Sequence, residues 1–281
     1  MTPSLYIAGI LDEYPKLARF ELEFLLAELL HCRRSELPLR LVSDEVSKAM
    51  MPLVARLAAG EPLAYIIGYT DFMDLRLKVS PAVLVPRPDT EWLMARLFET
   101  WQGPNPSRIL DLGTGSGAML LSALDHWPEA EGVGIDLDPA ARAVARANMR
   151  SLGFEERAEI LPGSWFDGVD GLFDLVLANP PYVAVDDPEL EGRARQFEPA
   201  LALFADEGGM ADLRHISAFA PDYLTPRGQL LMECGHAQVT QLVALLSARG
   251  FVDVTPMQDG AGRPRGARAR MSPDGLGHGC G

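Results

Sequence analysis

Apolar positions near the start of the chain follow the spacing of helices. One stripe repeats at i, i+3, i+4, i+7 and i+8, which places its side chains on a single helical face. Its members are Leu22, Leu25, Leu26, Leu29 and Leu30. Since no strand-like alternation appears before residue 72, the pattern predicts a small helical bundle.

A second stripe follows the same rule and predicts another helix of this bundle. It consists of Val46, Met50, Leu53, Val54 and Leu57. Either Ser43 or Asp44 can cap the start of this helix, and Gly60 can end it. Pro52 lies inside the pattern. Because a proline within a helix costs about 3 kcal/mol, we expect a kink or a new helix start there.

Residues 72–88 predict a β-hairpin connector. Its first arm alternates apolar with polar residues, at Leu75, Leu77 and Val79. The dipeptide Ser80-Pro81 supplies a turn, and residues 83–85 are expected to return as the second arm. Asp89 is then the expected N-cap of a helix that runs through Phe98.

From residue 108 onward, short apolar runs alternate with helical segments. The predicted strands are 108–112, 132–136, 158–161, 174–178 and 229–233, with a final strand over 265–271. This rhythm predicts an α/β domain with a mostly parallel, Rossmann-like sheet, helices on both faces, and ligands at the carboxyl ends of the strands. The predicted divisions are a helical domain over 1–75, the connector and a helix over 76–105, the α/β domain over 106–271 and a flexible tail over 272–281.

The charge of the chain bears on its partners. Asp and Glu outnumber Lys and Arg by 39 to 25 among 281 residues, so the net charge is −14. Binding through the phosphate backbone needs clustered basic residues. We therefore expect no direct nucleic-acid partner, although a nucleic acid as substrate stays open.

Cysteine and histidine usage points away from a metal site. Cys32, Cys234 and Cys280 are far apart, and the five histidines show no ligand spacing. No apolar stretch approaches the length of a membrane span, and the N-terminus lacks a signal-peptide pattern. We expect a soluble, cytoplasmic monomer without metal, disulfide framework or membrane contact.

A glycine-rich turn follows the strand over 108–112 and opens a helix. Its residues are Gly113, Thr114, Gly115, Ser116 and Gly117. Glycine lacks a Cβ, so the backbone turns tightly and a ligand can approach closely. Asp136 ends the next strand about 20 residues downstream, where an acid is placed to bind ribose hydroxyls.

Two cofactors remain compatible with this turn. Because Ala118 is a tolerated variant of the dinucleotide fingerprint, the loop alone leaves NAD open. The loop also resembles motif I of S-adenosylmethionine (SAM) methyltransferases. That ligand carries no phosphate, which agrees with the lack of Lys and Arg in residues 113–121.

The tetrapeptide Asn179-Pro180-Pro181-Tyr182 follows the strand over 174–178, at the carboxyl edge of the sheet. It resembles the motif of methyltransferases that act on planar, weakly nucleophilic nitrogens, either the exocyclic amine of adenine or a side-chain amide. The Asn179 side-chain oxygen can accept one N–H of such a group and the Pro180 carbonyl the other. The prolines stiffen the loop, and Tyr182 can pack on a flat amide. These residues are the candidate catalytic and substrate-binding segment, acting by positioning.

Further segments make the resemblance specific. Residues 17 to about 271 resemble the release factor glutamine methyltransferase family, PrmC/HemK. The matching segments are 60–68, 85–91, the glycine loop, Asp136, Trp165-Phe166, the NPPY tetrapeptide, 197–199, Glu233, Gly235 and Gln238. Segment 85–91 separates the chain from the ribosomal-protein relative PrmB, where that stretch differs.

The resemblance implies SAM-dependent N5-methylation of the glutamine in the Gly-Gly-Gln motif of class 1 peptide chain release factors. By the matching motifs, the glycine loop and Asp136 would bind SAM, and Trp165 would lie against the adenine. Asn179 would sit beside both the methyl donor and the glutamine. The tetrapeptide as a whole would hold the substrate. Without the family, Trp165 is more often a core aromatic.

The chain departs from the family pattern in two places. Gly163-Ser164 stands where Ser-Asp usually precedes Trp-Phe, which predicts the loss of an adenine-side carboxylate. Gly266 and Ala267 stand where bulkier apolar residues are common, which predicts a weakly packed last strand. The arginines of that region are expected to be solvated rather than to form an RNA patch; they are Arg263, Arg265, Arg268 and Arg270. Arg87 and Glu91 receive no chemical role from the sequence.

Three other functions stay open at this point. An adenine-N6 methyltransferase of DNA or RNA would share the glycine loop and the tetrapeptide, but the acidic charge disfavours it. A ribosomal-protein glutamine methyltransferase would share the chemistry. A binding module that kept the fold without catalysis is disfavoured by the intact Asn179.

Overall fold

The computed structural model describes residues 1–186 and 192–273, and the chain divides into two compact units. The first unit comprises Met1–Tyr69 and Gly192–Phe197, and the second comprises the rest. This division falls at Tyr69, upstream of the expected boundary at residue 75. Of the expected flexible tail, residues 274–281 lie outside the described residues.

The first unit is a helical bundle, as its periodicity predicts. Its elements are α1 (Pro3–Glu13), α2 (Arg19–Leu29), η1 (Arg34–Leu39), α3 (Asp44–Ala58), α4 (Leu63–Ile67) and α8 (Gly192–Phe197). The first predicted stripe lies on α2, where Leu22, Leu25 and Leu26 are fully buried. They share a core with residues of α1 and α3.

Helix α3 shows which residue caps its start and how it accommodates its internal proline. The side chain of Ser43 accepts a hydrogen bond from the Val46 backbone N–H at 3.3 Å, so Ser43 is the N-cap. The expected new start at Pro52 is wrong, because α3 runs unbroken from Asp44 to Ala58. Met50 and Val54 are fully buried on either side of the proline. Burying such side chains contributes about 1.5–3 kcal/mol each, which offsets the cost of the proline.

The hairpin exists, but with different arms. Strands β1 (Tyr69–Phe72) and β2 (Leu75–Lys78) form a two-stranded sheet, and Met73 has a positive φ of 51° in the turn between them. The expected return arm over residues 83–85 is not a strand. Instead, the Val83 N–H donates a hydrogen bond to the Ser80 carbonyl at 3.1 Å and closes a turn, and the Val83 side chain is buried.

The second unit contains a seven-stranded sheet in the order β5-β4-β3-β6-β7-β9-β8. The bounds are β3 (Arg108–Leu112), β4 (Glu131–Asp136), β5 (Ala158–Pro162), β6 (Phe173–Ala178), β7 (Leu224–Glu233), β8 (Phe251–Gln258) and β9 (Pro264–Met271). Strands β3 to β7 pair in parallel, while β9 runs antiparallel to both β7 and β8. The five predicted parallel strands and the final strand are confirmed. Sequence reasoning missed β8, most of whose residues are not buried.

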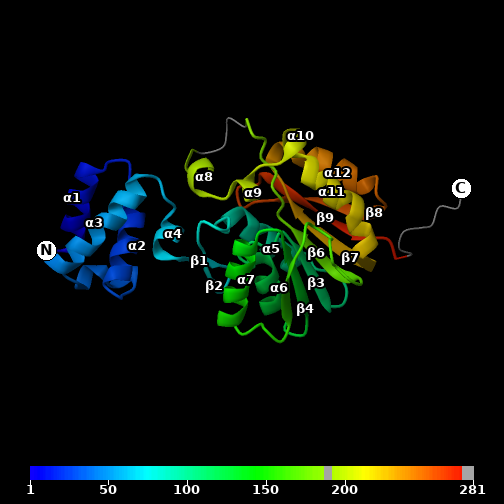
Figure 1. Ribbon diagram of the computed structural model, residues 1–281, viewed down its shortest axis with the longest axis horizontal. Coiled ribbons are helices and arrows are strands. Elements are labelled where there is room, and N and C mark those ends of the chain that lie inside the picture. The colour runs from blue at the N-terminus through cyan, green and yellow to red at the C-terminus, as the bar shows by residue number, and fades with distance from the viewer. Residues whose placement is uncertain (187–191, 274–281) are drawn as a thin grey trace, which may run out of the picture. The chain divides into compact units, whose positions relative to one another are not determined.

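Helices cover both faces of this sheet, as predicted (Figure 1). One face carries α5 (Pro88–Thr100), α6 (Ala118–His126) and α7 (Pro139–Ser151), and the other carries α11 (Ala211–Phe219) and α12 (Val239–Ser247). Side chains of β6 alternate between the two cores, because successive strand residues point to opposite faces. Leu175 and Leu177 pack with α5 and α6, whereas Val176 and Ala178 pack with α11 and α12. Short helices complete the unit: α9 (Ala200–Leu203), α10 (Asp206–Gly209), η2 (Ala220–Tyr223) and η3 (His236–Gln238).

The start of α5 differs from the expectation. Arg87 is its N-cap residue and Pro88 its first residue, so the prediction of Asp89 as N-cap is wrong. A proline at the first helical position lacks only an N–H that would be unpaired there anyway. The Asp89 carboxylate is thereby left to form an ion pair with Arg265 at 3.1 Å.

The last strand is closely packed, contrary to expectation. Gly266 lies opposite Glu233 in the β7–β9 ladder, and a Cβ on it would lie 2.3 Å from the Met232 carbonyl oxygen. Glycine is thus required by a close backbone approach. Ala267 is fully buried as well.

The arginines of this region are mostly not solvated. The side chain of Arg265 is 22% exposed and pairs with two carboxylates. Arg268 donates to the Thr100 carbonyl at 2.9 Å, and Arg270 forms an ion pair with Asp253. Arg263 alone of the four is exposed.

Candidate active site

A cavity of about 290 Å³ lies at the carboxyl ends of β3, β4 and β6, within the second unit. Eight residues that the sequence singled out line it: Gly113, Thr114, Gly115, Ser116, Asp136, Trp165, Asn179 and Pro181. Gly117, Pro180 and Tyr182 are not among the lining residues. The structure thus brings the glycine loop, the acid of β4 and the tetrapeptide to one cavity.

The glycine loop adopts a backbone that glycine favours. Gly113, Gly115 and Gly117 all have positive φ, between 56° and 84°. The Thr114 N–H donates to the Ile135 carbonyl at 2.9 Å, which ties the loop to the end of β4. Gly117 packs at the start of α6, because a Cβ there would lie 3.1 Å from the Leu121 side chain.

Asp136 joins the loop to the next turn. One carboxylate oxygen accepts the Gly115 N–H at 2.8 Å, and the other accepts the Asp138 N–H at 2.9 Å. Burial raises the pKa of Asp136, and these two backbone hydrogen bonds oppose the rise. Each oxygen accepts one such bond, so each keeps a lone pair for a ligand hydroxyl in the cavity.

Asp111 is the most deeply buried acid of the cavity wall. It is the last residue but one of β3, is 2% exposed, and accepts a hydrogen bond from the Thr114 hydroxyl at 2.6 Å. Burial raises the pKa of Asp111 to about 7, against that hydrogen bond. The pair fixes the Thr114 side chain beneath the loop.

Trp165 is partly buried, and it lies beside the loop while also packing against the core. Its ring would be 3.5 Å from a Cβ on Gly113, and its φ is positive at 53°. Asp212 lines the same cavity; burial raises its pKa, and a hydrogen bond with the Trp165 side chain opposes that rise. Ser164 also lines the cavity, and Gly163 is confined, because a Cβ there would lie 2.5 Å from the Asp167 carbonyl oxygen.

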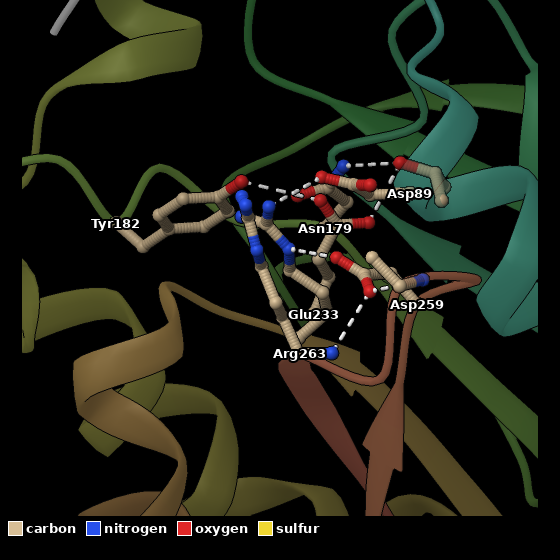
Figure 2. A network of polar contacts seen from close by, with 9 residues as sticks. Asp89, Asn179, Tyr182, Glu233, Asp259 and Arg263 are labelled. Carbon is tan, nitrogen blue, oxygen red and sulfur yellow. Dashed lines mark hydrogen bonds and ion pairs between the residues drawn. The ribbon is translucent and has the colours of Figure 1, made fainter.

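Asn179 lies at the cavity wall with its amide held from behind. Its Nδ2 donates to the Thr90 hydroxyl at 3.3 Å, and that hydroxyl donates to Glu233 Oε2 at 2.6 Å. The Tyr182 hydroxyl donates to the other oxygen, Oε1, at 3.2 Å. Figure 2 shows this network, in which Asn179 and Tyr182 both converge on Glu233.

The two titratable members of this network carry shifted pKa values. Burial raises the pKa of Glu233 to about 7, while the hydrogen bonds from Thr90 and Tyr182 oppose the rise. Burial and the neighbouring Glu233 carboxylate raise the pKa of Tyr182 above its usual value. Tyr182 is therefore a neutral donor throughout the physiological range and has no role as a base.

The backbone after the tetrapeptide is clamped by Gln238. Its Nε2 donates to the Tyr182 carbonyl at 2.9 Å and to the Gly209 carbonyl at 3.2 Å. Its Oε1 accepts the Gly235 N–H at 2.9 Å. Gly209 must be glycine, since a Cβ would lie 2.2 Å from the Tyr182 carbonyl oxygen.

The structure also gives roles to residues that the sequence left unassigned. Arg87 forms an ion pair with the buried Glu198, which links the segment before α5 to the Phe-Glu-Pro segment. Glu91 accepts the Met73 N–H at 2.7 Å and so holds the hairpin turn. The motif matches had marked both residues, but only the fold shows their partners.

Asn148 was missed entirely. It is fully buried and exchanges two hydrogen bonds with the Lys78 backbone, at 2.7 and 3.0 Å. Its Nδ2 also donates to the Ser116 carbonyl at 2.8 Å. Asn148 therefore links the hairpin to the glycine loop.

Within residues 1–186 and 192–273, no group of three or more His, Cys, Asp or Glu side chains is arranged to hold a metal ion. Over the same residues, every helix is too short or too polar to cross a membrane.

Two family models match the chain. The model described as Methyltransferase small domain matches residues 89–213, and the model described as PrmC N-terminal domain matches residues 10–68. Together they extend over both units.

Curated relatives cover most of the chain. A release factor glutamine methyltransferase of Aliivibrio fischeri is 40% identical over 81% of this chain and 80% of its own length. Its namesake from Vibrio cholerae is 43% identical over 76% and 74%. That of Geobacter sulfurreducens is 36% identical over 90% of each chain.

Solved structures share the fold at low sequence identity. A methyltransferase from Pyrococcus furiosus has a TM-score of 0.55 at 17% identity, over 78% of this chain and 97% of that one. A 16S rRNA methyltransferase of Thermus thermophilus, in complex with AdoMet and guanosine, has a TM-score of 0.53 at 18% identity, over 72% and 49%. At this level the likeness establishes the class I methyltransferase fold.

Proposed function

Because this chain belongs to the family of release factor glutamine methyltransferases, we propose that it methylates the glutamine of the Gly-Gly-Gln motif in class 1 release factors. The methyl donor is SAM, and the product is N5-methylglutamine. One observation carries the proposal: Asn179 lines the same cavity as the glycine loop and Asp136.

The cavity fits SAM by the chemistry of its walls. The loop glycines leave room for a ligand, the Trp165 ring offers a flat surface for an adenine, and Asp136 offers lone pairs to ribose hydroxyls. The loop has no basic side chain, as suits a ligand without phosphate. Bound SAM supplies an electrophilic methyl group on a sulfonium.

The adenine side retains acidic and polar groups despite the absence of the family's usual aspartate. Ser164 and Asp212 both line the cavity near Trp165. We propose that they take part in adenine binding there.

Asn179 and Pro180 bind and orient the nucleophile, which is the amide nitrogen of the substrate glutamine. An amide nitrogen shares its lone pair with the carbonyl, so it reacts only when it is held in line with the methyl group. The Oδ1 of Asn179 accepts one N–H of the substrate amide, and the Pro180 carbonyl accepts the other. Pro181 lines the cavity beside them.

This chemistry depends on the positioning of the substrate amide and not on a strong base. Tyr182 stays protonated, and Glu233 is buried behind Thr90 without lining the cavity. The proton that the methylated nitrogen loses passes to water. Tyr182 supports the site indirectly: its hydroxyl donates a hydrogen bond to Glu233, and its backbone carbonyl accepts one from Gln238.

We further propose that the helical unit recognises the protein substrate. The cavity is built from residues of the second unit alone. A cavity that holds one glutamine side chain discriminates little among proteins, so specificity needs additional surface. The helical unit is the sizeable part of the chain that the cavity leaves unused.

A panel of substrates tests the proposal. The full-length protein is incubated with SAM and, separately, a class 1 release factor, a ribosomal protein, and duplex and single-stranded DNA and RNA containing adenine. Peptide mass spectrometry should locate one added methyl group on the Gly-Gly-Gln glutamine of the release factor. Methylation of adenine, or of a ribosomal protein in preference to the release factor, would replace this function with one of the alternatives.

A further inference from the structure

Asn179 is connected to the buried Glu233 through one hydroxyl group. Thr90 lies in the first turn of α5, is 3% exposed, and separates the amide from the carboxylate. The Asn179 Nδ2 to Thr90 Oγ1 distance is 3.3 Å, and the Thr90 Oγ1 to Glu233 Oε2 distance is 2.6 Å. A short O–H···O distance of this size is typical of a hydroxyl that donates to an ionised carboxylate.

The single proton of that hydroxyl determines which end of the amide faces the cavity. An ionised carboxylate can only accept hydrogen bonds, so the Thr90 hydroxyl donates its hydrogen bond to Glu233. Thr90 then has only lone pairs left for Asn179, which must turn Nδ2 toward it. The acceptor Oδ1 is thereby directed to the cavity, where a substrate N–H needs an acceptor.

A protonated Glu233 would release this constraint. Its own O–H can donate to Thr90, which frees the Thr90 proton for the Oδ1 of Asn179. The amide then turns its Nδ2 toward the cavity, where a donor would face the N–H donors of the substrate. Transfer requires the first arrangement and is disfavoured by the second.

We propose that Thr90 and Glu233 are positioning residues that fix the orientation of the Asn179 amide through the Thr90 hydroxyl. This inference rests on the proposed function, since it assigns Asn179 to the substrate amide. Thr90 lines the cavity beside Asn179, whereas Glu233 does not, and the role proposed for both is to act on the substrate through Asn179. The Tyr182 hydroxyl occupies the other oxygen of Glu233 and leaves Oε2 for Thr90.

Charged groups around Glu233 shift its pKa and so determine the pH range over which Glu233 is ionised. Asp89 on α5 raises the pKa of Glu233, and Arg265 on β9 lowers it. Arg265 is held in place by ion pairs with Asp89 and Asp259, at 3.1 and 3.0 Å. Cys234, which directly follows β7, is buried, and burial and the Glu233 carboxylate raise its pKa. Tyr182 stays neutral, so it contributes no competing charge.

Paired substitutions at Thr90 test the hydroxyl itself. Thr90→Val keeps the shape and removes the hydroxyl, whereas Thr90→Ser keeps the hydroxyl. Thr90→Val should lower kcat about tenfold to a hundredfold at pH 8 with an unchanged Kd for SAM, while Thr90→Ser stays within about threefold of wild type. Equal activity of Thr90→Val and wild type would overturn the inference.

The pH profile provides a readout that a merely structural role would not change. The pKa of Glu233 is raised to about 7, so the ionised form is lost as the pH falls through that value. Wild type and Thr90→Ser should therefore show kcat falling below about pH 7. Thr90→Val and Glu233→Gln should lack this limb, whatever their plateau activity. Asp111, whose pKa is also raised to about 7, is the same in all of these proteins, so a limb of equal size in wild type, Thr90→Val and Glu233→Gln would contradict the relay.

A spectroscopic arm separates this inference from the proposed function. The side-chain amide resonance of Asn179, assigned in ¹⁵N-labelled protein by its loss in Asn179→Ala, should titrate near pH 7 in wild type. The titration should persist in Thr90→Ser and vanish in Thr90→Val. An amide signal that is indifferent to pH and to Thr90→Val would refute the relay even in an active enzyme. Absence of glutamine methylation by wild type, with the titration intact, would refute only the proposed function.

Discussion

Buried polar side chains hold the parts of the cavity at fixed positions. Asp111, Asn148 and Glu233 are each at most 2% exposed, and each is hydrogen-bonded. Leaving such a group without its partner costs about 1–3 kcal/mol, more for a charged group. Their partners lie in the glycine loop, in the hairpin and beside the tetrapeptide. These residues therefore couple the stability of the fold to the geometry of the site.

Replacing the amide of Asn179 tests its role directly. Asn179→Ala should lose nearly all methyl transfer while SAM still binds, because the variant loses the acceptor for the substrate N–H. The loss of a positioned acceptor costs on the order of 3 kcal/mol in the barrier, or about a hundredfold in rate. The exposed Asn105 offers a matched control, and Asn105→Ala should leave the rate unchanged. Near-wild-type turnover of Asn179→Ala would remove Asn179 from the mechanism.

Two neighbouring carboxylates should behave differently. Asp136→Ala loses the acceptor for the Gly115 N–H and the proposed ribose contact, so it should weaken SAM binding strongly. Asp138 is the N-cap of α7 and accepts the Ala140 N–H at 2.8 Å. Asp138→Ala should therefore cost about 1 kcal/mol of stability and little affinity. Calorimetry in which Asp138→Ala loses as much SAM affinity as Asp136→Ala would show that the ribose acid has been misassigned.

At the scale of elements, the hairpin belongs to the second unit. Phe72, Leu75 and Leu77 are buried in the core that α5 and α6 share with the sheet. The hydrogen bonds between Lys78 and Asn148 add a polar link to α7. Removing the helical unit should thus be tolerated only when the hairpin stays.

Two truncations test this together with substrate recognition. A chain starting at Thr70 keeps the hairpin and should bind SAM, yet it should not methylate a release factor. A chain starting at Ser80 loses three core residues and should unfold at a markedly lower temperature, as judged by circular dichroism. Undiminished methylation by the chain that starts at Thr70 would exclude the helical unit from recognition.

Local signals were predictable from the sequence, and distant partners were not. The glycine loop and the tetrapeptide each follow directly after a strand, so their placement at the edge of the sheet follows from the strand pattern. Thr90 and Glu233 are 143 residues apart, and only the folded sheet brings them together. The hairpin arms were shifted because the alternation continues past the turn at Met73. Strand β8 was missed because few of its side chains are buried.

At the scale of the whole molecule, the cavity belongs to one of the two units. One unit holds every residue that lines the cavity, and the other matches the PrmC N-terminal domain. A net charge of −14 favours a protein substrate over a phosphate backbone. The central claim is therefore that the chain recognises a protein and modifies one glutamine in it.

Transfer of a labelled methyl group tests this claim most directly. Full-length enzyme and radiolabelled SAM are incubated with a class 1 release factor or with its variant in which the Gly-Gly-Gln glutamine is alanine. The native factor should be labelled, and the variant should not. Equal label in the variant, or label only in nucleic acid added to the same reaction, would contradict the claim.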